Sequence, residues 1–276
     1  MEGVAADSLD PPIIEISAAQ TQRHQDGTKT IHGFFVTKTV LGEGSFAKVK
    51  LCVHKLTGAE FAIKVFRKLP LRRKREFIRS DTGEGMKVRT TLDKVYDEIS
   101  LMKIVSHSKC VRMHAVLDEA APDGKLYVVL EYLPGGPSME WDPSERCFRT
   151  RAGGPITEQM AQRYTIDTLQ ALDYLHGQRI AHRDVKPQNL LLEAHGSGLK
   201  LGDFGVAARM PDDCVVQGTE GTYQFFSPEM CAIGYKGHDG RRADIWAAGI
   251  SLWAFLFHTL PFLNEVRRDS VFEPCP

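Results

Sequence analysis

The sequence predicts an α+β protein of two lobes, because strand-like segments come first along the chain and helical segments follow them. Short runs of β-branched, aromatic and alternating apolar residues recur between Phe34 and Leu130. The run Pro134-Gly135-Gly136-Pro137 breaks regular structure, and beyond it apolar residues recur mainly at helical spacing. We therefore expect a flexible tail over 1–33, a first lobe over 34–133 and a second lobe over 134–276.

The first lobe is predicted to be a sheet with one main helix. Leu92, Val95, Ile99 and Met102 recur at helical spacing and predict the helix. The basic, glycine-containing segment 67–89 before it is either a solvated loop or a docking site, with a nuclear-localisation signal as a weaker third interpretation. The expected strands, of which the first three are antiparallel, are 34–37, 49–53, 60–66, 111–116 and 126–130.

The second lobe is predicted to be mostly helical. One helix should begin after Thr157 and end at Gly177. The apolar run from Ile245 to Phe257 predicts a buried helix that is too short to span a membrane.

Composition restricts the kinds of partner and compartment. The 276 residues include 35 basic and 35 acidic side chains, so net charge gives no reason to expect a nucleic-acid or membrane-surface binder. The six cysteines form no CxxC pair, and the first residues do not resemble a secretory signal. We expect a cytoplasmic protein, with the nucleus as the alternative, that has no nucleic-acid or membrane partner.

The run Gly42-Glu43-Gly44-Ser45-Phe46-Ala47 fits a phosphate-binding glycine loop found in two unrelated classes of protein. Apolar and polar residues alternate after it, with β-branched Val49 and Val53, so the loop joins two strands and does not open a helix. This disfavours a dinucleotide-binding enzyme. Ala62 and Lys64 share one face of the next strand, which favours a lysine that contacts phosphate over one that is merely solvated.

Two further sequence motifs follow the glycine loop and Lys64 along the chain. The run His182-Arg183-Asp184-Val185-Lys186-Pro187-Gln188-Asn189 is followed by Asp203-Phe204-Gly205. Together with the glycine loop and Lys64, these motifs closely resemble the eukaryotic protein kinase family, and Lys186 resembles the Ser/Thr type. The resemblance implies the two-lobed protein kinase fold and transfer of the γ-phosphate of ATP, with Mg²⁺, to a hydroxyl group of a protein substrate.

The resemblance also implies a role for each matching residue. Asp184 would accept the proton of the attacking hydroxyl, and Lys186 would add a second cation beside the transferred group. Lys64 would hold the α- and β-phosphates and would itself be fixed by Glu98, whose alternative is a solvated helix residue. Asn189 and Asp203 would bind Mg²⁺. The implied ATP-binding residues are Leu41, Gly42, Glu43, Gly44, Ser45, Phe46, Ala47, Lys48, Val49, Ala62, Lys64, Leu130, Glu131, Leu133 and Leu191.

Three stretches are similar to the calcium/calmodulin-dependent protein kinase kinases and to the kinases that activate AMP-activated kinases. They are the basic segment with Arg72-Arg73-Lys74-Arg75, the run 94–99 and the run 136–140. This likeness implies that the substrate is another kinase, phosphorylated on its activation-loop threonine. The chain ends at Pro276, so we expect the second lobe to be incomplete and the calmodulin-binding tail to be missing.

Regulation and anchoring are predicted from three more positions. Thr219 is a candidate phosphosite, because Arg183 could pair with a phosphate there. Asp212-Asp213 could already supply that negative charge, so we expect activity to depend only weakly on Thr219. Asp244 resembles the residue that anchors the catalytic loop, or it is a helix cap. His182 is expected to be a packed residue.

The alternative for the whole chain is a catalytically idle kinase-fold binding module.

Overall fold

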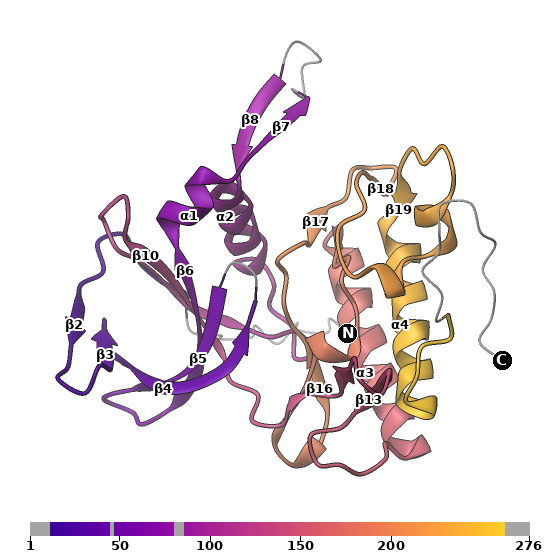
Figure 1. Cartoon of the computed structure of the whole chain (residues 1–276), viewed down its shortest axis with the longest axis horizontal. Coiled ribbons are helices and arrows are strands. Elements are labelled where there is room, and N and C mark those ends of the chain that lie inside the picture. Colours follow the sequence, from indigo (N-terminus) through magenta and orange to yellow (C-terminus); the bar gives the residue numbers. More distant parts are fainter. Residues whose placement is uncertain (1–11, 45–46, 80–85, 263–276) are drawn as a thin grey trace, which may run out of the picture. The chain divides into compact units, whose positions relative to one another are not determined.

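The computed structural model describes residues 12–44, 47–79 and 86–262 (Figure 1). The chain forms two compact units, one made of 1–74 and 113–132 and the other of 75–112 and 133–276. The second boundary lies one residue from the lobe boundary expected from the sequence. The segment 75–112, expected in the first lobe, belongs instead to the second unit.

The first unit is built on an eight-stranded sheet (Figure 1). A short helix α1 (Lys68–Arg73) follows β6. All neighbouring strands are antiparallel except β1 and β9, which are parallel. In spatial order the strands are β1 (Ile14–Ile16), β9 (Met113–Asp118), β10 (Lys125–Glu131), β6 (Glu60–Arg67), β5 (Ala47–His54), β4 (Phe34–Glu43), β3 (Lys29–Ile31) and β2 (Thr21–Arg23).

The prediction of a flexible tail is wrong over residues 14–31, where the structure has β1, β2 and β3. Ile31 is completely buried in the core of the sheet. The Thr21 hydroxyl donates a 2.7 Å hydrogen bond to Glu119, and Lys29 Nζ donates one of 2.8 Å to the Tyr127 hydroxyl. Each of these strands has three residues, which is too short to show a hydrophobic period, and each is stabilised by partners far along the chain.

One face of this sheet carries the core of the first unit. Cys52, Ile63, Tyr127 and Val129 lie on this face and pack with buried residues of β3, β4 and β9. Because side chains alternate along a strand, the residues between them face the other way. The register therefore determines which residues the first unit can present to a ligand.

The second unit begins with a hairpin that leads into helix α2 (Thr91–Met102) (Figure 1). The hairpin strands are β7 (Arg75–Arg79) and β8 (Met86–Thr90). With α1 they replace the solvated loop that was one interpretation of the basic segment. The predicted helix is confirmed: the Thr90 side chain accepts from the Asp93 backbone N–H while the Asp93 carboxylate accepts from the Thr90 N–H, a capping box.

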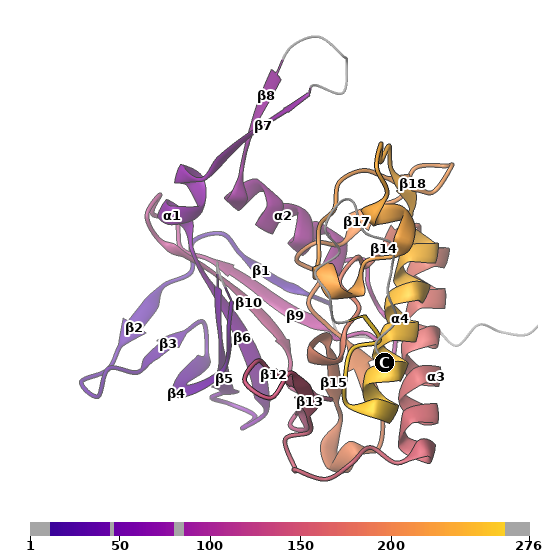
Figure 2. The ribbon, with the colours of Figure 1, turned by 45° about the vertical axis from the view of Figure 1, so that its right-hand side comes forward.

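The helices predicted after Thr157 and around Ile245–Phe257 are α3 (Glu158–Gly177) and α4 (Gly240–Phe257), which lie side by side in Figures 1 and 2. The Thr157 hydroxyl caps α3 by accepting from the Met160 N–H at 3.2 Å. Tyr164 and Phe255 pack edge to face across the two helices, with ring centroids 5.8 Å apart. No helix among the described residues is long and apolar enough to cross a membrane.

Short strands and turns around these helices form the rest of the second unit. They bring loops from distant parts of the chain to one side of α3 and α4. The paired strands are β11 (Gly136–Pro137) with β15 (Leu190–Leu192) and β16 (Leu199–Leu201), β12 (Glu140–Asp142) with β13 (Cys147–Arg149), β14 (Ile180–Ala181) with β17 (Ala208–Arg209), and β18 (Val215–Val216) with β19 (His238–Asp239). The single turns of 3₁₀ helix are Pro187–Asn189, Ala194–Gly196, Tyr223–Phe225 and Pro228–Cys231.

Candidate active site

A buried carboxylate on α4 holds the loop that follows β14. Asp244 is 1% exposed, and its Oδ2 and Oδ1 accept from the backbone N–H groups of His182 at 2.9 Å and Arg183 at 2.8 Å. The ring Nε2 of His176 donates to Oδ2 at 2.9 Å. The cap of α4 is Asp239, so the helix-cap interpretation of Asp244 is wrong, and Asp244 anchors the loop instead.

Four side chains meet at the end of this loop, with Asp184 at their centre. Asn189 Nδ2 donates to Asp184 Oδ2 at 2.9 Å, and Lys186 Nζ lies 2.8 Å from the same oxygen. The Thr222 hydroxyl donates to Asp184 Oδ1 at 2.6 Å and accepts from Lys186 Nζ at 2.6 Å. Hydrogen bonds to an ionised group are short and strong, so both carboxylate oxygens have a fixed direction.

Thr222 was not among the candidate site residues, although the sequence places it directly after a glycine. That glycine gives the reason for its position. Gly221 has φ of 112°, and a Cβ atom there would overlap the carbonyl oxygen of Arg183. Only glycine fits at this point, so the segment can approach the loop closely enough for Thr222 to reach Asp184.

The two candidate metal ligands lie at one end of a strand pair. Leu190 pairs with Leu201, and the next residues continue the ladder, since the Gly202 N–H donates to the Asn189 carbonyl at 2.9 Å. Asp203 follows immediately. The amide nitrogen of Asn189 is used by Asp184, which makes its amide oxygen the atom available to a cation.

This donor set fits Mg²⁺. The ion prefers oxygen ligands and keeps several waters or phosphate oxygens when only one or two protein groups bind it. Among the described residues there is no group of three His, Cys, Asp or Glu side chains that could enclose a metal. Two oxygen donors, from Asn189 and Asp203, would leave the other positions around a bound Mg²⁺ to water or phosphate oxygens.

His182 and Glu98 are both buried beside these residues. His182 Nε2 donates to the Gly202 carbonyl at 3.0 Å, and its ring packs edge to face on Phe204, so it is a packed residue as expected. Glu98 on α2 is 7% exposed, and a Cβ atom on Gly205 would lie 3.7 Å from its Oε2 and 3.3 Å from Asp203 Oδ1. The interpretation of Glu98 as a solvated helix residue is therefore wrong.

In the first unit the sheet register confirms that Ala62 and Lys64 share a face. Val49 pairs with Lys64, and Ala62 pairs with Leu130, so these four side chains lie on the face opposite the core of the unit. The Lys64 ammonium lies 5.4 Å from the centre of the Phe66 ring. At these four positions the face of the sheet presents three apolar side chains and one cation.

The glycine loop is part of the β4–β5 hairpin, as the alternating pattern predicted. Gly42 pairs with Val49 and Glu43 with Lys48, and the Glu43 and Lys48 side chains form an exposed ion pair at 2.8 Å. The strand after the loop rules out the helix that a dinucleotide site requires. Leu41 lies in β4, Ala47 begins β5, and Ser45 and Phe46 lie outside the described residues.

The remaining candidates for nucleotide binding lie in or just after strands β10 and β15. Leu130 and Glu131 end β10, the buried Leu133 follows, and Leu191 is half-buried in β15. The structure brings Lys64, Val49, Ala62 and Leu130 together in the first unit. In the second unit it brings together Asp184, Lys186 and Asn189. It also places the carboxylates of Glu98 and Asp203 close to Gly205.

Comparison with known proteins identifies the family of the chain. The family model described as the protein kinase domain matches residues 35–273. The chain therefore belongs to the protein kinase domain family.

Several curated relatives are named as protein kinases. The chain is 33% identical over 254 residues to a probable serine/threonine-protein kinase of Dictyostelium discoideum, covering 92% of this chain and 33% of that protein. It is 36% identical over 239 residues to CBL-interacting protein kinase 9 of Oryza sativa, covering 85% and 46%. It is 36% identical over 251 residues to a calcium/calmodulin-dependent protein kinase kinase of Caenorhabditis elegans, covering 85% and 44%. The chain thus spans between a third and a half of the length of these relatives.

Proposed function

We propose that the protein is a serine/threonine protein kinase, which transfers the γ-phosphate of ATP to a hydroxyl group of a protein substrate in a Mg²⁺-dependent reaction. The observation that carries the proposal is the geometry around Asp184. Its carboxylate is oriented by Asn189, Lys186 and Thr222, and the loop that carries it is anchored to α4 by Asp244. The family membership and the names of the relatives support the same reaction.

In the proposed mechanism the protein positions charges and one proton acceptor. Asp184 receives the proton of the substrate hydroxyl at a carboxylate oxygen as that hydroxyl attacks. Lys186, which lies 2.8 Å from Asp184, supplies a positive charge where negative charge develops on the transferred group. Asn189 and Asp203 would hold a magnesium ion, which would neutralise phosphate charge. Lys64 is proposed to contact the nonreacting phosphates, and Glu98 is the acid that the family resemblance assigns to hold it.

Nucleotide binding is assigned to the apolar and glycine-rich surfaces described above. Val49, Ala62, Leu130 and Leu191 supply apolar contacts for the base, and Glu131 and Leu133 supply backbone groups. The Gly42–Ala47 loop brings backbone N–H groups to the phosphates.

The finer proposal is that the substrate is itself a kinase, phosphorylated on its activation-loop threonine. It is supported by the likeness to a calcium/calmodulin-dependent protein kinase kinase. We assign the protein to the cytoplasm, with the nucleus as the alternative. A peptide with the activation-loop sequence of an AMP-activated kinase should be a better acceptor than its threonine-to-alanine variant and than casein. Equal label in all three would contradict the finer proposal alone.

The reaction itself is tested with radiolabelled ATP. The purified chain, incubated with γ-labelled ATP, Mg²⁺ and casein, should label the protein on serine and threonine, as acid hydrolysis of the product would identify. Excess EDTA should abolish the label, and Asp203→Asn should reduce it strongly because it removes a proposed Mg²⁺ ligand. If wild type and Asp203→Asn both gave only background label, the idle binding module would be the better description; equal label above background would contradict the role of Asp203.

A further inference from the structure

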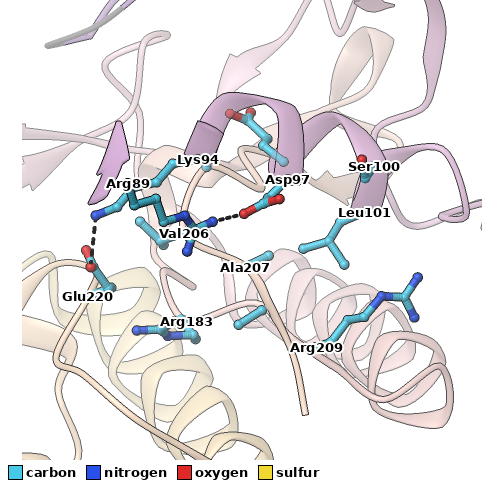
Figure 3. Close-up of a pocket in the computed structure, with 13 residues that line it drawn as sticks. Arg89, Lys94, Asp97, Ser100, Leu101, Arg183, Val206, Ala207, Arg209 and Glu220 are labelled. Carbon is cyan, nitrogen blue, oxygen red and sulfur yellow. Dashed lines mark ion pairs between the residues drawn. The ribbon is translucent and has the colours of Figure 1, made fainter. Parts of the chain in front are cut away.

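Helix α2 and residues 203–229, here called the activation segment, line a charged cavity of about 370 Å³ within the second unit (Figure 3). One wall is α2 together with Arg89, and another is the segment that follows Asp203-Phe204-Gly205. Arg183 from the catalytic loop and Glu220 from the activation segment also line it. The cavity therefore lies where the helix that carries Glu98 meets the segment that carries Thr222.

The cations around this cavity have different partners. Arg89 forms an ion pair with Asp97, and Figure 3 shows Arg209 directed away from Glu220. Lys94 on α2 forms two ion pairs, one with Glu76 at 2.8 Å and one with Glu220 at 3.6 Å. The second pair, drawn as a dashed line in Figure 3, joins the helix to the activation segment.

Arg183 is the other cation that Glu220 affects. Burial lowers the pKa of the Arg183 guanidinium, and the negative charge of Glu220 is the largest opposing influence. The guanidinium also donates to the Gln217 carbonyl at 3.4 Å. A partly buried arginine needs a nearby negative charge, and Glu220 lies between Gln217 and Gly221 on the segment that Arg183 contacts.

We propose that Glu220 is a positioning residue whose carboxylate ties the activation segment to α2 through Lys94 and supplies the negative charge opposite Arg183 while Thr219 is unphosphorylated. The proposal rests on the proposed kinase function. It assigns to a glutamate of this chain the bridging charge that a phosphate on Thr219 would otherwise provide.

The position of Glu220 connects it to two parts of the catalytic site. Thr222, two residues along the chain, donates to Asp184. Lys94 and Glu98 are four residues apart on α2 and so lie on the same side of the helix. One ion pair therefore acts on the segment that completes the Asp184 network and on the helix that positions Glu98.

The carboxylates of Asp212 and Asp213, which were expected to supply negative charge near Arg183, have other partners. Asp212 pairs with Arg179 at 2.7 Å, and Asp213 accepts from the Val215 backbone N–H at 3.0 Å. The expectation that Asp212-Asp213 supply the charge opposite Arg183 is replaced by Glu220. Thr219 itself is exposed.

The effect of this pair should be moderate. The side chains of Lys94 and Glu220 are 33% and 49% exposed, and ion pairs of this kind change an equilibrium by about twofold to fivefold. We therefore expect Glu220→Gln to lower kcat about twofold to fivefold and to leave the KM for ATP within twofold. Glu220→Gln keeps the size of the side chain and removes only its charge.

A double-mutant cycle tests the link between the two residues. Lys94→Gln should lower kcat as Glu220→Gln does, and the double variant should be no worse than the more impaired single variant. Glu76→Gln is the matched control, because it removes the other partner of Lys94 without changing the activation segment, and it should alter kcat less. Thr219→Ala should keep most of the activity.

Hydrogen exchange supplies a readout that does not depend on catalysis. Backbone amides of 206–222 should exchange faster in Glu220→Gln than in wild type, and at the wild-type rate in Glu76→Gln. Unchanged exchange and unchanged kcat in Glu220→Gln would overturn the proposal, as would loss of nearly all activity in folded Thr219→Ala. If wild type transferred no phosphate, the proposed function would fail, while the exchange rates would still decide the role of Glu220.

Discussion

Replacement of Asp244 by asparagine tests how the catalytic loop is held. The carboxylate accepts three hydrogen bonds, from the backbone of His182 and Arg183 and from the His176 ring. An amide has one oxygen, so at least one of these donors would face an NH₂ group that cannot accept. Hydrogen bonds to a charged group contribute about 1.5 to 3 kcal/mol each, and one or two of them would be lost. We expect Asp244→Asn to lower the free energy of unfolding by about 3–5 kcal/mol.

The same change should impair catalysis more than loss of global stability alone would. Arg183 has φ of 68°, and a non-glycine residue in this region costs about 1–2 kcal/mol, so the loop is held against local strain. When Asp244 no longer holds it, the loop can relax and move Asp184. We expect kcat to fall at least about tenfold in protein that is still folded, which corresponds to about 1.4 kcal/mol.

Urea unfolding, followed by tryptophan fluorescence and circular dichroism, measures the stability term, and initial rates at saturating ATP measure kcat. Asp173→Asn on the exposed face of α3 is the matched control and should change stability by no more than about 0.5 kcal/mol. If Asp244→Asn lost less than about 1 kcal/mol and kept kcat within twofold of wild type, the anchoring role of Asp244 would be refuted.

Three other changes have expected outcomes. Gly221→Ala should lower kcat about tenfold or more, because the alanine Cβ atom would overlap the Arg183 carbonyl and displace Thr222. A kcat near that of wild type would contradict the close approach of Gly221 to the Arg183 carbonyl. Burial, with the charge of Arg183, lowers the pKa of His238 below its usual value near 6.5. As the pH falls, the imidazole is therefore protonated in the unfolded chain before it is protonated in the folded one, so the free energy of unfolding should fall below about pH 6.5. His238→Gln should weaken this pH dependence, as urea titrations at several pH values would measure. Burial raises the pKa of both Cys52 and Cys110 to about 12. A brief pulse of iodoacetamide at pH 8 should therefore leave both thiols unmodified in folded protein, as peptide mass spectrometry would measure. Rapid alkylation of either cysteine would contradict its burial.

The long helices and the catalytic motifs could be predicted from the sequence because their signals are local. Apolar residues at helical spacing, with Thr157 as a cap, define α3, and the run from His182 to Asn189 contains most of its own network. The alternation after the glycine loop predicted the β4–β5 hairpin, although it does not determine the register that places Ala62 and Lys64 on one face with Leu130.

The features that escaped prediction depend on partners distant in sequence. The three-residue strands β1 to β3 are too short to show a period. They form because β1 can pair with β9, β3 with β4, and β2 with β3. Thr222 reaches Asp184 only because Gly221 permits a close approach, and Glu220 reaches Lys94 only because the fold brings α2 to the activation segment. No local pattern in the sequence reports such contacts.

The most direct test of the account is the rate of phosphoryl transfer by Asp184→Asn, measured beside wild type at saturating ATP and Mg²⁺. Asparagine keeps the shape of the side chain and removes the proton acceptor. The account predicts a fall in kcat of about 10²- to 10⁴-fold with the affinity for ATP changed by no more than a few fold. Equal rates for the two proteins would contradict the role of Asp184, and equal rates no higher than those without enzyme would identify the chain as a kinase-fold module that does not catalyse phosphoryl transfer.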